Sequence, residues 1–356
     1  MQNSELSQAC GTFHPKEQAM PVVLQFDRPG SPTVLEYRDI ATPEPGPGEV
    51  LYRVLAFGLN RADILLMADV YYNSPVYPAR LGHDAAGIVE AVGSGVTRFR
   101  VGDYVSSIAQ EDGRYGVNGE IAITPEDYVV AWPKGFNALE ACSVWSSALT
   151  SYYSLVELVT LTPGDTVLIT AASSTAGTGA IQMAKLCGAR VIATSRGHDK
   201  TDFLRAVGAD HIIVTETDDV ADEIRKITNG RGVNVVFDMV SGAFVDRYVG
   251  ALAKGASVHL VGAVGGDLIT NFSVLPLVQA GATITGFSIF NYSRDKTRLE
   301  RAKTFILDAL NRQQFKPIID RVYDFADTVR AYEYMQAGSQ KGKIVVRVSP
   351  DAELRL

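Results

Sequence analysis

Cysteine is scarce in this sequence of 356 residues, and long basic or apolar runs are missing. Cys10, Cys142 and Cys187 stand far apart without a C-x-x-C spacing, so neither a disulfide framework nor a structural zinc knot is indicated. A net charge of -7 without clustered Lys and Arg argues against a nucleic-acid or anionic-membrane partner. No apolar run approaches membrane-spanning length. These absences favour a cytoplasmic protein with a small-molecule partner.

The N-terminal residues lack the apolar stretch of a secretory signal. Residues 1–20 are polar throughout, and we interpret them as a flexible N-terminal extension.

The remaining length suits two domains of different texture. From Pro21 to about Pro133, short β-rich runs such as "EVLYRVLAFG" and "EDYVVAW" alternate with Pro and Gly, which indicates a β-rich, partly barrel-like unit. From Ala138 the strands "VLIT", "RVIATS", "HIIV", "VNVVFDMV" and "SVHLVGA" alternate with helical segments. This order predicts an α/β unit with a doubly wound parallel sheet.

After Gly281 the sequence predicts a strand "TITGFSIF", a long helix from about Asp295 to Asn311, a strand "RVYDF", a helix "ADTVRAYEYMQ" and a last strand "KIVVRV". The simplest assembly inserts the α/β unit into the β-rich unit. We therefore expect a β-rich domain of residues 21–145 and 290–356 and an α/β domain of residues 146–289.

The segment "VLITAASSTAGTGAIQMAK", from Val167 to Lys185, reads as a strand, a tight turn and a helix. A dinucleotide-binding turn carries G-x-G-x-x-G there, but these positions hold Ala172, Ser174 and Gly177. One interpretation is a phosphate turn in which a hydroxyl replaces the second glycine. The other is an ordinary helix start capped by Ser173, Ser174 or Thr175.

The end of the next strand favours the first interpretation. NAD sites place an acidic residue there for the ribose 2′-hydroxyl, whereas this sequence has Ser195 and Arg196, followed by Lys200. A guanidinium binds a 2′-phosphate through paired, charge-assisted bonds. The sequence thus predicts NADPH as cofactor. The alternative is that Arg196 and Lys200 are only solvent-exposed side chains at the start of a helix.

These blocks together resemble the medium-chain dehydrogenase/reductase superfamily, in its zinc-independent quinone oxidoreductase branch. The resemblance runs from about Val22 to Val348 and is carried by "PGPGEVLYRVLAFGLNRAD", "PARLGHDAAGIVEAVGSGVTRFRVGDYV", "ALTSYYSL", "ITNGRGVNVVFDMVSG" and the closing "GKIVV". It implies a GroES-like catalytic domain around a Rossmann domain, and a homodimer joined through edge strands of the Rossmann sheets.

Zinc alcohol dehydrogenases of this superfamily bind catalytic zinc with Cys, His and Cys. Here the resemblance places Asn60, His83 and Ser146 at those positions, and one nitrogen ligand cannot hold the ion. The cysteines of the structural zinc lobe are also missing between Arg98 and Pro125. We therefore expect no metal, and hydride transfer to an already electrophilic carbon.

Two residues are the candidate catalytic groups. Asn60 is a candidate hydrogen-bond donor to the substrate or the nicotinamide ribose, although Asn60 and Asp63 also form the pattern of a helix-capping pair. Tyr71 lies where related enoyl reductases carry a Tyr, and is the candidate donor to the substrate oxygen; Tyr72 is its neighbour.

The remaining candidate residues fall into two sets. The expected cofactor-binding residues are Ser173, Ser174, Thr175, Ala176, Gly177, Ser195, Arg196, Lys200, Val261, Gly262, Ala263 and Lys343. The expected substrate-pocket residues are Asp63, Tyr72, His83, Trp145, Phe287 and Phe290.

The leading hypothesis is a metal-free, NADPH-dependent reductase of enones, enals or quinones. One alternative is a stand-alone enoyl reductase of a polyketide or acyl-thioester pathway. Another is an NADPH-binding regulatory or structural protein without turnover. A zinc-type alcohol dehydrogenase is the least favoured alternative.

Overall fold

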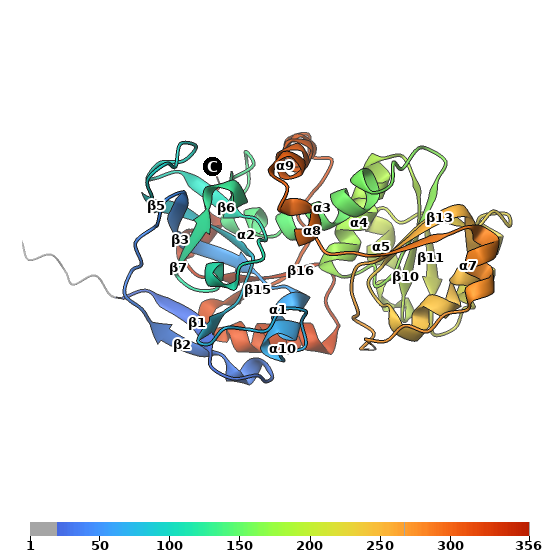
Figure 1. The fold of residues 1–356 in the computed structure, drawn as a ribbon, viewed down its shortest axis with the longest axis horizontal. Coiled ribbons are helices and arrows are strands. Elements are labelled where there is room, and N and C mark those ends of the chain that lie inside the picture. Colours follow the sequence, from blue (N-terminus) through green and yellow to red (C-terminus); the bar gives the residue numbers. More distant parts are fainter. Residues whose placement is uncertain (1–19, 267, 356) are drawn as a thin grey trace, which may run out of the picture.

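A computed structural model describes residues 20–266 and 268–355, so the expectation for residues 1–20 lies almost entirely outside the described residues. The parallel sheet and a mixed sheet lie at opposite ends of the molecule in Figure 1, with α3 (Trp145–Tyr152), α8 (Phe290–Ser293) and α9 (Lys296–Asn311) between them. The helices α1 (Arg61–Met67) and α10 (Thr328–Ala337) lie below the mixed sheet in this view.

The parallel sheet has six strands in the order β11-β10-β9-β12-β13-β14, which is the strand order of a Rossmann fold. All neighbours in it pair in parallel. Its strands are β9 (Thr166–Ile169), β10 (Arg190–Ser195), β11 (His211–Val214), β12 (Val233–Asp238), β13 (Leu252–Leu260) and β14 (Thr283–Gly286).

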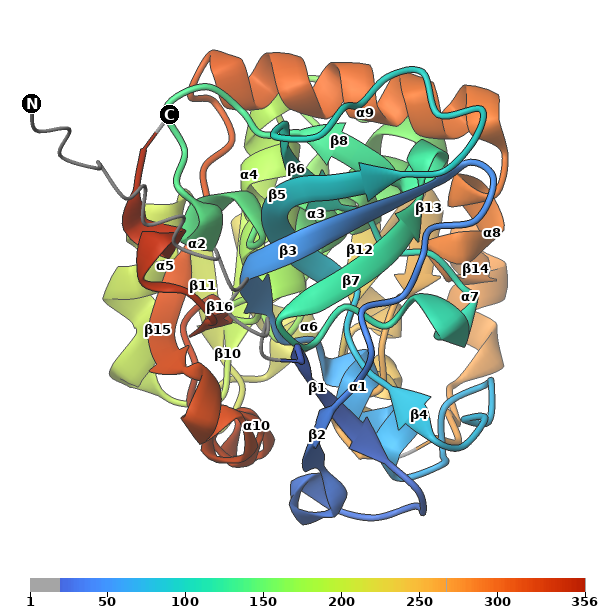
Figure 2. The same ribbon diagram turned by 90° about the vertical axis from the view of Figure 1, so that its left-hand side faces the viewer.

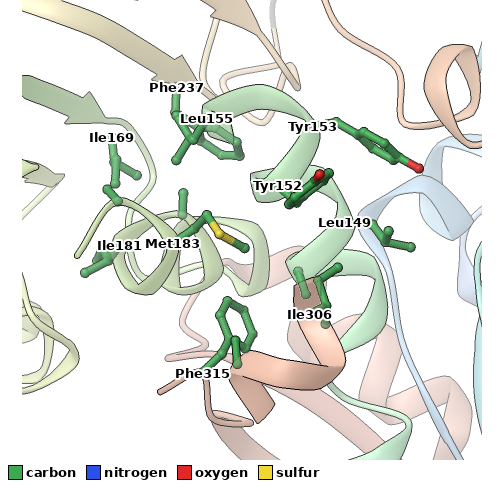
Figure 3. Packing of buried hydrophobic residues seen from close by; sticks show 14 of the residues in the cluster. Leu149, Tyr152, Tyr153, Leu155, Ile169, Ile181, Met183, Phe237, Ile306 and Phe315 are labelled. Atoms are coloured by element: carbon green, nitrogen blue, oxygen red, sulfur yellow. The ribbon is translucent and has the colours of Figure 1, made fainter. Parts of the chain in front are cut away.

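Helices cover both faces of this sheet because its strands are apolar on both sides. Val167 and Ile169 pack with residues of α3, α4 and α9 such as Ile181. Figure 3 shows Ile169 and Ile181 of this cluster in close-up. Leu168, between them, faces the other way and packs with Ile224 of α6. The helices of this part are α3 (Trp145–Tyr152), α4 (Thr175–Leu186), α5 (Thr201–Val207), α6 (Val220–Ile227) and α7 (Val274–Ala280).

The mixed sheet follows the order β15-β16-β3-β5-β6-β8, with β7 paired to β3, and a small sheet β2-β1-β4 stands beside it. Figure 2 looks onto this end of the molecule. The strands are β1 (Val22–Phe26), β2 (Glu36–Asp39), β3 (Glu49–Gly58), β4 (Ala79–Arg80), β5 (Asp84–Val92), β6 (Tyr104–Ser107), β7 (Ile121–Pro125), β8 (Val129–Ala131), β15 (Ile319–Asp324) and β16 (Lys343–Arg347). This arrangement and the Rossmann sheet agree with the predicted α/β fold class.

The C-terminal part of the chain returns to the mixed sheet, where β16 pairs with β3. The predicted long helix is α9 (Lys296–Asn311), and Asp295 caps it by accepting from the N–H groups of Thr297 and Arg298. The helix α10 (Thr328–Ala337) packs into the core of the mixed sheet through Tyr332 and Met335.

Two local details differ from what the sequence predicted, and a third agrees with it. The strand predicted through "TITGFSIF" ends at Gly286, and α8 (Phe290–Ser293) begins soon after. The sequence analysis did not predict β7 or α7. The helices α1 (Arg61–Met67) and α2 (Ala138–Ala141) are short, and the Asn60 to Asp63 pattern does form a capping box at the start of α1. Within residues 20–266 and 268–355, no helix is both long and apolar enough to cross a membrane.

Candidate active site

A cavity of about 1030 Å³ lies at the carboxyl ends of the Rossmann strands and faces the mixed sheet. Residues within two positions after the ends of β9, β10, β11, β12, β13 and β14 all line it. Ligands of open α/β sheets bind at this edge. The cavity therefore occupies the place where such a fold binds a nucleotide.

Most of the predicted site residues line this cavity. These are Asn60, Tyr71, Tyr72, His83, Ser173, Ser174, Thr175, Ala176, Ser195, Arg196, Lys200, Val261, Gly262, Ala263, Phe287 and Phe290. The structure does not place Asp63, Trp145, Gly177 or Lys343 on its wall.

The turn after β9 caps the start of α4 and also presents backbone N–H groups that have no acceptor among the described residues. Ser174 caps α4, because its hydroxyl accepts from the Gly177 N–H at 3.1 Å. Thr175 and Ala176 begin the helix, and their N–H groups have no acceptor among the described residues. Both residues line the cavity, so these two N–H groups and the helix N-terminus suit a phosphate.

Gly177 serves packing and does not reach the cavity. A Cβ at this position would lie 2.6 Å from the carbonyl oxygen of Ala172 and 2.7 Å from that of Ala171. The absence of a side chain at Gly177 therefore lets the helix approach the strand, which is the packing role of the third glycine in dinucleotide turns. The capping and the phosphate-turn interpretations of this segment are compatible.

Arg196 and Lys200 meet at the end of β10. The Lys200 ammonium lies 3.3 Å from the Ser173 hydroxyl, and burial lowers its pKa. Both cations also bind backbone carbonyls: Arg196 and Lys200 each donate to Gly338 at 3.2 Å, and Lys200 donates to Gln340 at 3.3 Å. The Ser195 hydroxyl donates to the Gly197 carbonyl, so it closes the local turn.

The 338–342 segment was not predicted to belong to the site. It runs from the end of α10 to β16 and lies beside the phosphate turn: the Gly342 N–H donates to the Ser173 carbonyl at 2.9 Å, and the Thr175 hydroxyl donates to the Gly342 carbonyl at 3.1 Å. Gln340 lines the cavity, and its buried side-chain oxygen has no hydrogen-bond partner among the described residues. The segment thus joins the mixed-sheet part of the chain to the nucleotide end of the cavity.

A polar cluster of Asn60, Asp84, Ser146 and Lys343 lies in and behind the cavity wall, and its members Asn60 and Ser146 line the cavity. The Lys343 ammonium lies 2.6 Å from Oδ2 of Asp84, and both side chains are buried, with 1% and 2% exposed. Ser146 donates to Oδ1 of Asp84 at 2.7 Å, and the Asn60 amide donates to Oδ2 at 3.0 Å. Lys343 also donates to Oδ1 of Asn60 at 2.9 Å.

This cluster changes how Asn60 and Lys343 are understood. One amide hydrogen of Asn60 faces Asp84, the other lies near the Gly58 carbonyl at 3.4 Å, and its oxygen accepts from Lys343. Protein groups therefore use the donors that we expected Asn60 to offer a ligand. Lys343 was expected to contact the cofactor, but its buried ammonium is directed to Asp84 and Asn60 instead.

Two predicted pocket residues lie in the protein interior. Asp63 is 2% exposed, accepts from the Asn60 N–H at 2.9 Å and from the Tyr332 hydroxyl at 3.0 Å, and burial raises its pKa. Trp145 is fully buried in the hydrophobic core formed by α3, α4 and α9. The capping geometry of α1 explains the position of Asp63, and the inward face of α3 explains that of Trp145.

Aromatic side chains surround the other end of the cavity. The rings of Tyr71 and Tyr72 are 4.3 Å apart, and Phe290 lies 6.4 Å from Tyr72 and 5.7 Å from His83. Burial raises the pKa of Tyr71, so its phenol stays protonated at neutral pH. An apolar, aromatic wall with a few polar groups is typical of small-molecule sites.

The sequence analysis missed several wall residues, among them Arg61, Ser146, Met239 and residues 335–340. Arg61 follows Asn60 directly and forms no ion pair with a described residue. The resemblance had named Ser146 only as a lost zinc position. In the described part of the chain, no three His, Cys, Asp or Glu side chains are grouped to hold a metal ion.

The chain matches two family profiles, and relatives cover nearly its whole length. Residues 46–134 match the alcohol dehydrogenase GroES-like domain, and residues 176–305 match the zinc-binding dehydrogenase family. A quinone oxidoreductase of Pseudomonas aeruginosa is 32% identical over 91% of this chain and 98% of its own length.

Solved structures give the same result. The Escherichia coli quinone oxidoreductase, solved in complex with NADPH, is 26% identical and superposes with a TM-score of 0.84 over 92% of this chain and 100% of its own. The CurK enoyl reductase is 27% identical, with a TM-score of 0.82 over 92% of this chain and 99% of its own.

Proposed function

Because the chain belongs to the medium-chain dehydrogenase/reductase superfamily, in its quinone oxidoreductase-like branch, we propose that it is an NADPH-dependent oxidoreductase that reduces a quinone or the activated C=C bond of an enone or enal. The observation that carries this proposal is the cavity, which joins a cationic end at Arg196 and Lys200 to an aromatic end at Tyr71, Tyr72 and Phe290.

The nucleotide end fits NADPH by its chemistry. Free N–H groups of Thr175 and Ala176 at a helix N-terminus suit the pyrophosphate. Arg196 and Lys200 suit the 2′-phosphate, and they bind carbonyls of the 338–342 segment that a phosphate can replace. The E. coli quinone oxidoreductase, solved with NADPH, has the same fold.

Bound NADPH would supply the hydride, and the protein supplies orientation and hydrogen bonds. Hydride addition to an enone or quinone leaves negative charge on the substrate oxygen. A protonated Tyr71 phenol beside the aromatic wall suits the donor to that oxygen. Since protein groups use its amide, Asn60 acts in this proposal by holding the inner wall together with Asp84 and Lys343.

An enoyl reductase acting on thioesters is the second candidate, supported by the similarity to the CurK enoyl reductase. Such an enzyme would receive a larger substrate from a carrier partner, for which a basic surface at the cavity mouth is expected. Next to Tyr72 the structure has an ion pair, Arg294 with Glu111 at 2.7 Å, whose charges offset each other. This arrangement favours the small uncharged substrates of the first candidate.

The test measures oxidation of NADPH and NADH with 1,4-benzoquinone, but-2-enal and an enoyl thioester. We expect turnover of benzoquinone or but-2-enal, with NADPH preferred over NADH. Turnover of the thioester alone would favour the second candidate. Tight NADPH binding without turnover of any substrate would refute a reductase and support the regulatory alternative.

We also propose a homodimer formed through β14, one of the two edge strands of the Rossmann sheet. Beside it, α7 and the preceding segment expose the large apolar side chains Leu268, Ile269, Phe272, Val274, Leu275 and Val278. A sheet edge next to an apolar surface favours pairing with a second copy. Light scattering should give twice the chain mass, and Leu275→Glu should lower it to one chain. A cytoplasmic location accords with the free thiols of Cys142 and Cys187.

A further inference from the structure

A second apolar surface lies at the aromatic end of the cavity, on the loop between α1 and β4. Four large apolar side chains of residues 70–77 are exposed: Val70 at 51%, Tyr72 at 54%, Val76 at 85% and Tyr77 at 39%. The sequence of this loop, "VYYNSPVY", contains no charged residue. Single exposed apolar residues are common, but four within eight residues call for an explanation.

This surface is continuous with the cavity through one residue. Tyr72 lines the cavity and is also about half exposed, so the cavity and the exposed apolar side chains of the loop meet at this residue. On the inner side it contacts Tyr71, and Phe290 lies beyond it. A molecule longer than the inner part of the cavity therefore meets the 70–77 loop when it emerges beside Tyr72.

The loop is held at both ends, so this surface is formed before any ligand arrives. At its start the Val70 N–H donates to the Leu65 carbonyl of α1 at 3.0 Å. At its end the Tyr77 ring packs edge-on against the buried Phe26, 5.7 Å away, and Ala79 pairs with Phe26 in the small sheet. A preformed surface loses little conformational entropy on binding.

From this continuity we infer that the 70–77 loop is a binding site for an apolar substrate tail, so that the substrates are enals, enones or quinones with an alkyl or isoprenoid chain. The inference rests on the proposed function, because the reacting head group must occupy the cavity. The tail then lies over Tyr72, Val70 and Val76, with one side against the protein.

The experiment compares kcat/KM for but-2-enal, hex-2-enal, oct-2-enal and dec-2-enal at saturating NADPH. A fully buried methylene raises kcat/KM about fourfold, and a methylene covered on one side about twofold. Dec-2-enal has four more methylenes than hex-2-enal, so we expect an increase of roughly sixteenfold between them. The double variant Val70→Ser/Val76→Ser should lose most of this increase.

The matched control is Val101→Ser, which changes a valine of 65% exposure that does not line the cavity, and it should keep the increase. A flat series in the unmodified protein, or an undiminished increase in the double variant, would overturn the tail site while leaving the proposed function intact. Turnover of neither the alkenals nor 1,4-benzoquinone would overturn both, whereas turnover of benzoquinone without any alkenal would overturn the tail site alone. A changed oligomeric state of the double variant would assign the loop to a contact between copies and also overturn the tail site.

Discussion

The buried ion pair of the polar cluster allows a quantitative prediction for stability. Lys343 and Asp84 are 2.6 Å apart with almost no exposure, so removing one partner leaves a buried charge without its counter-charge. Such a change lowers the free energy of unfolding by about 3–5 kcal/mol. After Lys343→Met the carboxylate keeps its bonds from Asn60 and Ser146, and we expect about 3 kcal/mol. After Asp84→Leu the ammonium keeps only the Asn60 oxygen, and we expect about 5 kcal/mol.

Urea unfolding followed by tryptophan fluorescence is a suitable assay, because Trp145 is fully buried and adjoins Ser146. The double variant Asp84→Leu/Lys343→Met removes both charges, so it should lower the free energy of unfolding less than Asp84→Leu alone does. As a control, Lys226→Met breaks a pair of the same 2.6 Å length, Lys226 with Glu223, that is exposed to solvent, and should have no resolvable effect. Additive costs in the double variant would refute the reasoning.

The remaining predictions concern the cofactor, the proton donor, the helix cap and pH. Arg196→Ala should raise the KM for NADPH at least tenfold and leave that for NADH unchanged, because only the 2′-phosphate loses a charge-assisted bond; equal effects would contradict the assignment. Tyr71→Phe should lower kcat about a hundredfold with little change in KM, and an unchanged kcat would remove Tyr71 from the mechanism. Ser174→Ala should cost about 1 kcal/mol of stability as the cap is lost, yet leave the KM for NADPH nearly unchanged, since the N–H groups of the helix start remain; the reverse pattern would show direct phosphate contact. Burial lowers the pKa of His259 to about 4, so the unfolded chain takes up this proton first as the pH falls. Stability should therefore decrease by about 3 kcal/mol between pH 6.5 and pH 4, and the decrease should be smaller in His259→Gln when unfolding is measured at both pH values.

Much of the fold was readable from local patterns. The strands of the parallel sheet are short apolar runs separated by amphipathic helices. A strand that is apolar on both sides must be buried on both sides, so this pattern indicates a parallel sheet with helices on both faces. Asp295 marks the start of α9 because a helix cap depends on residues three positions apart. These features are local, so a single sequence contains them.

The missed parts of the site depend on distant residues. Asp84 and Lys343 are 259 positions apart, and neither belongs to a local sequence motif that predicts their ion pair. The backbone carbonyls of Gly338 and Gln340 accept hydrogen bonds from Lys200. Because every residue type has a backbone carbonyl, the sequence does not indicate which carbonyls take part in the site. Asn60 showed the opposite problem, because its residue type suggested a free donor and only its neighbours show that the amide is occupied.

The position of Lys343 along the chain has a consequence for biosynthesis. Asn60, Asp84 and Ser146 leave the ribosome long before Lys343, so a nascent chain carries the Asp84 carboxylate without its partner while the Rossmann strands are still being made. The 338–342 segment, which lies along the phosphate turn, is equally late. The two halves of the cavity can each begin to fold during translation. The cluster of Asn60, Asp84, Ser146 and Lys343, however, is complete only after β16 emerges and supplies the ammonium.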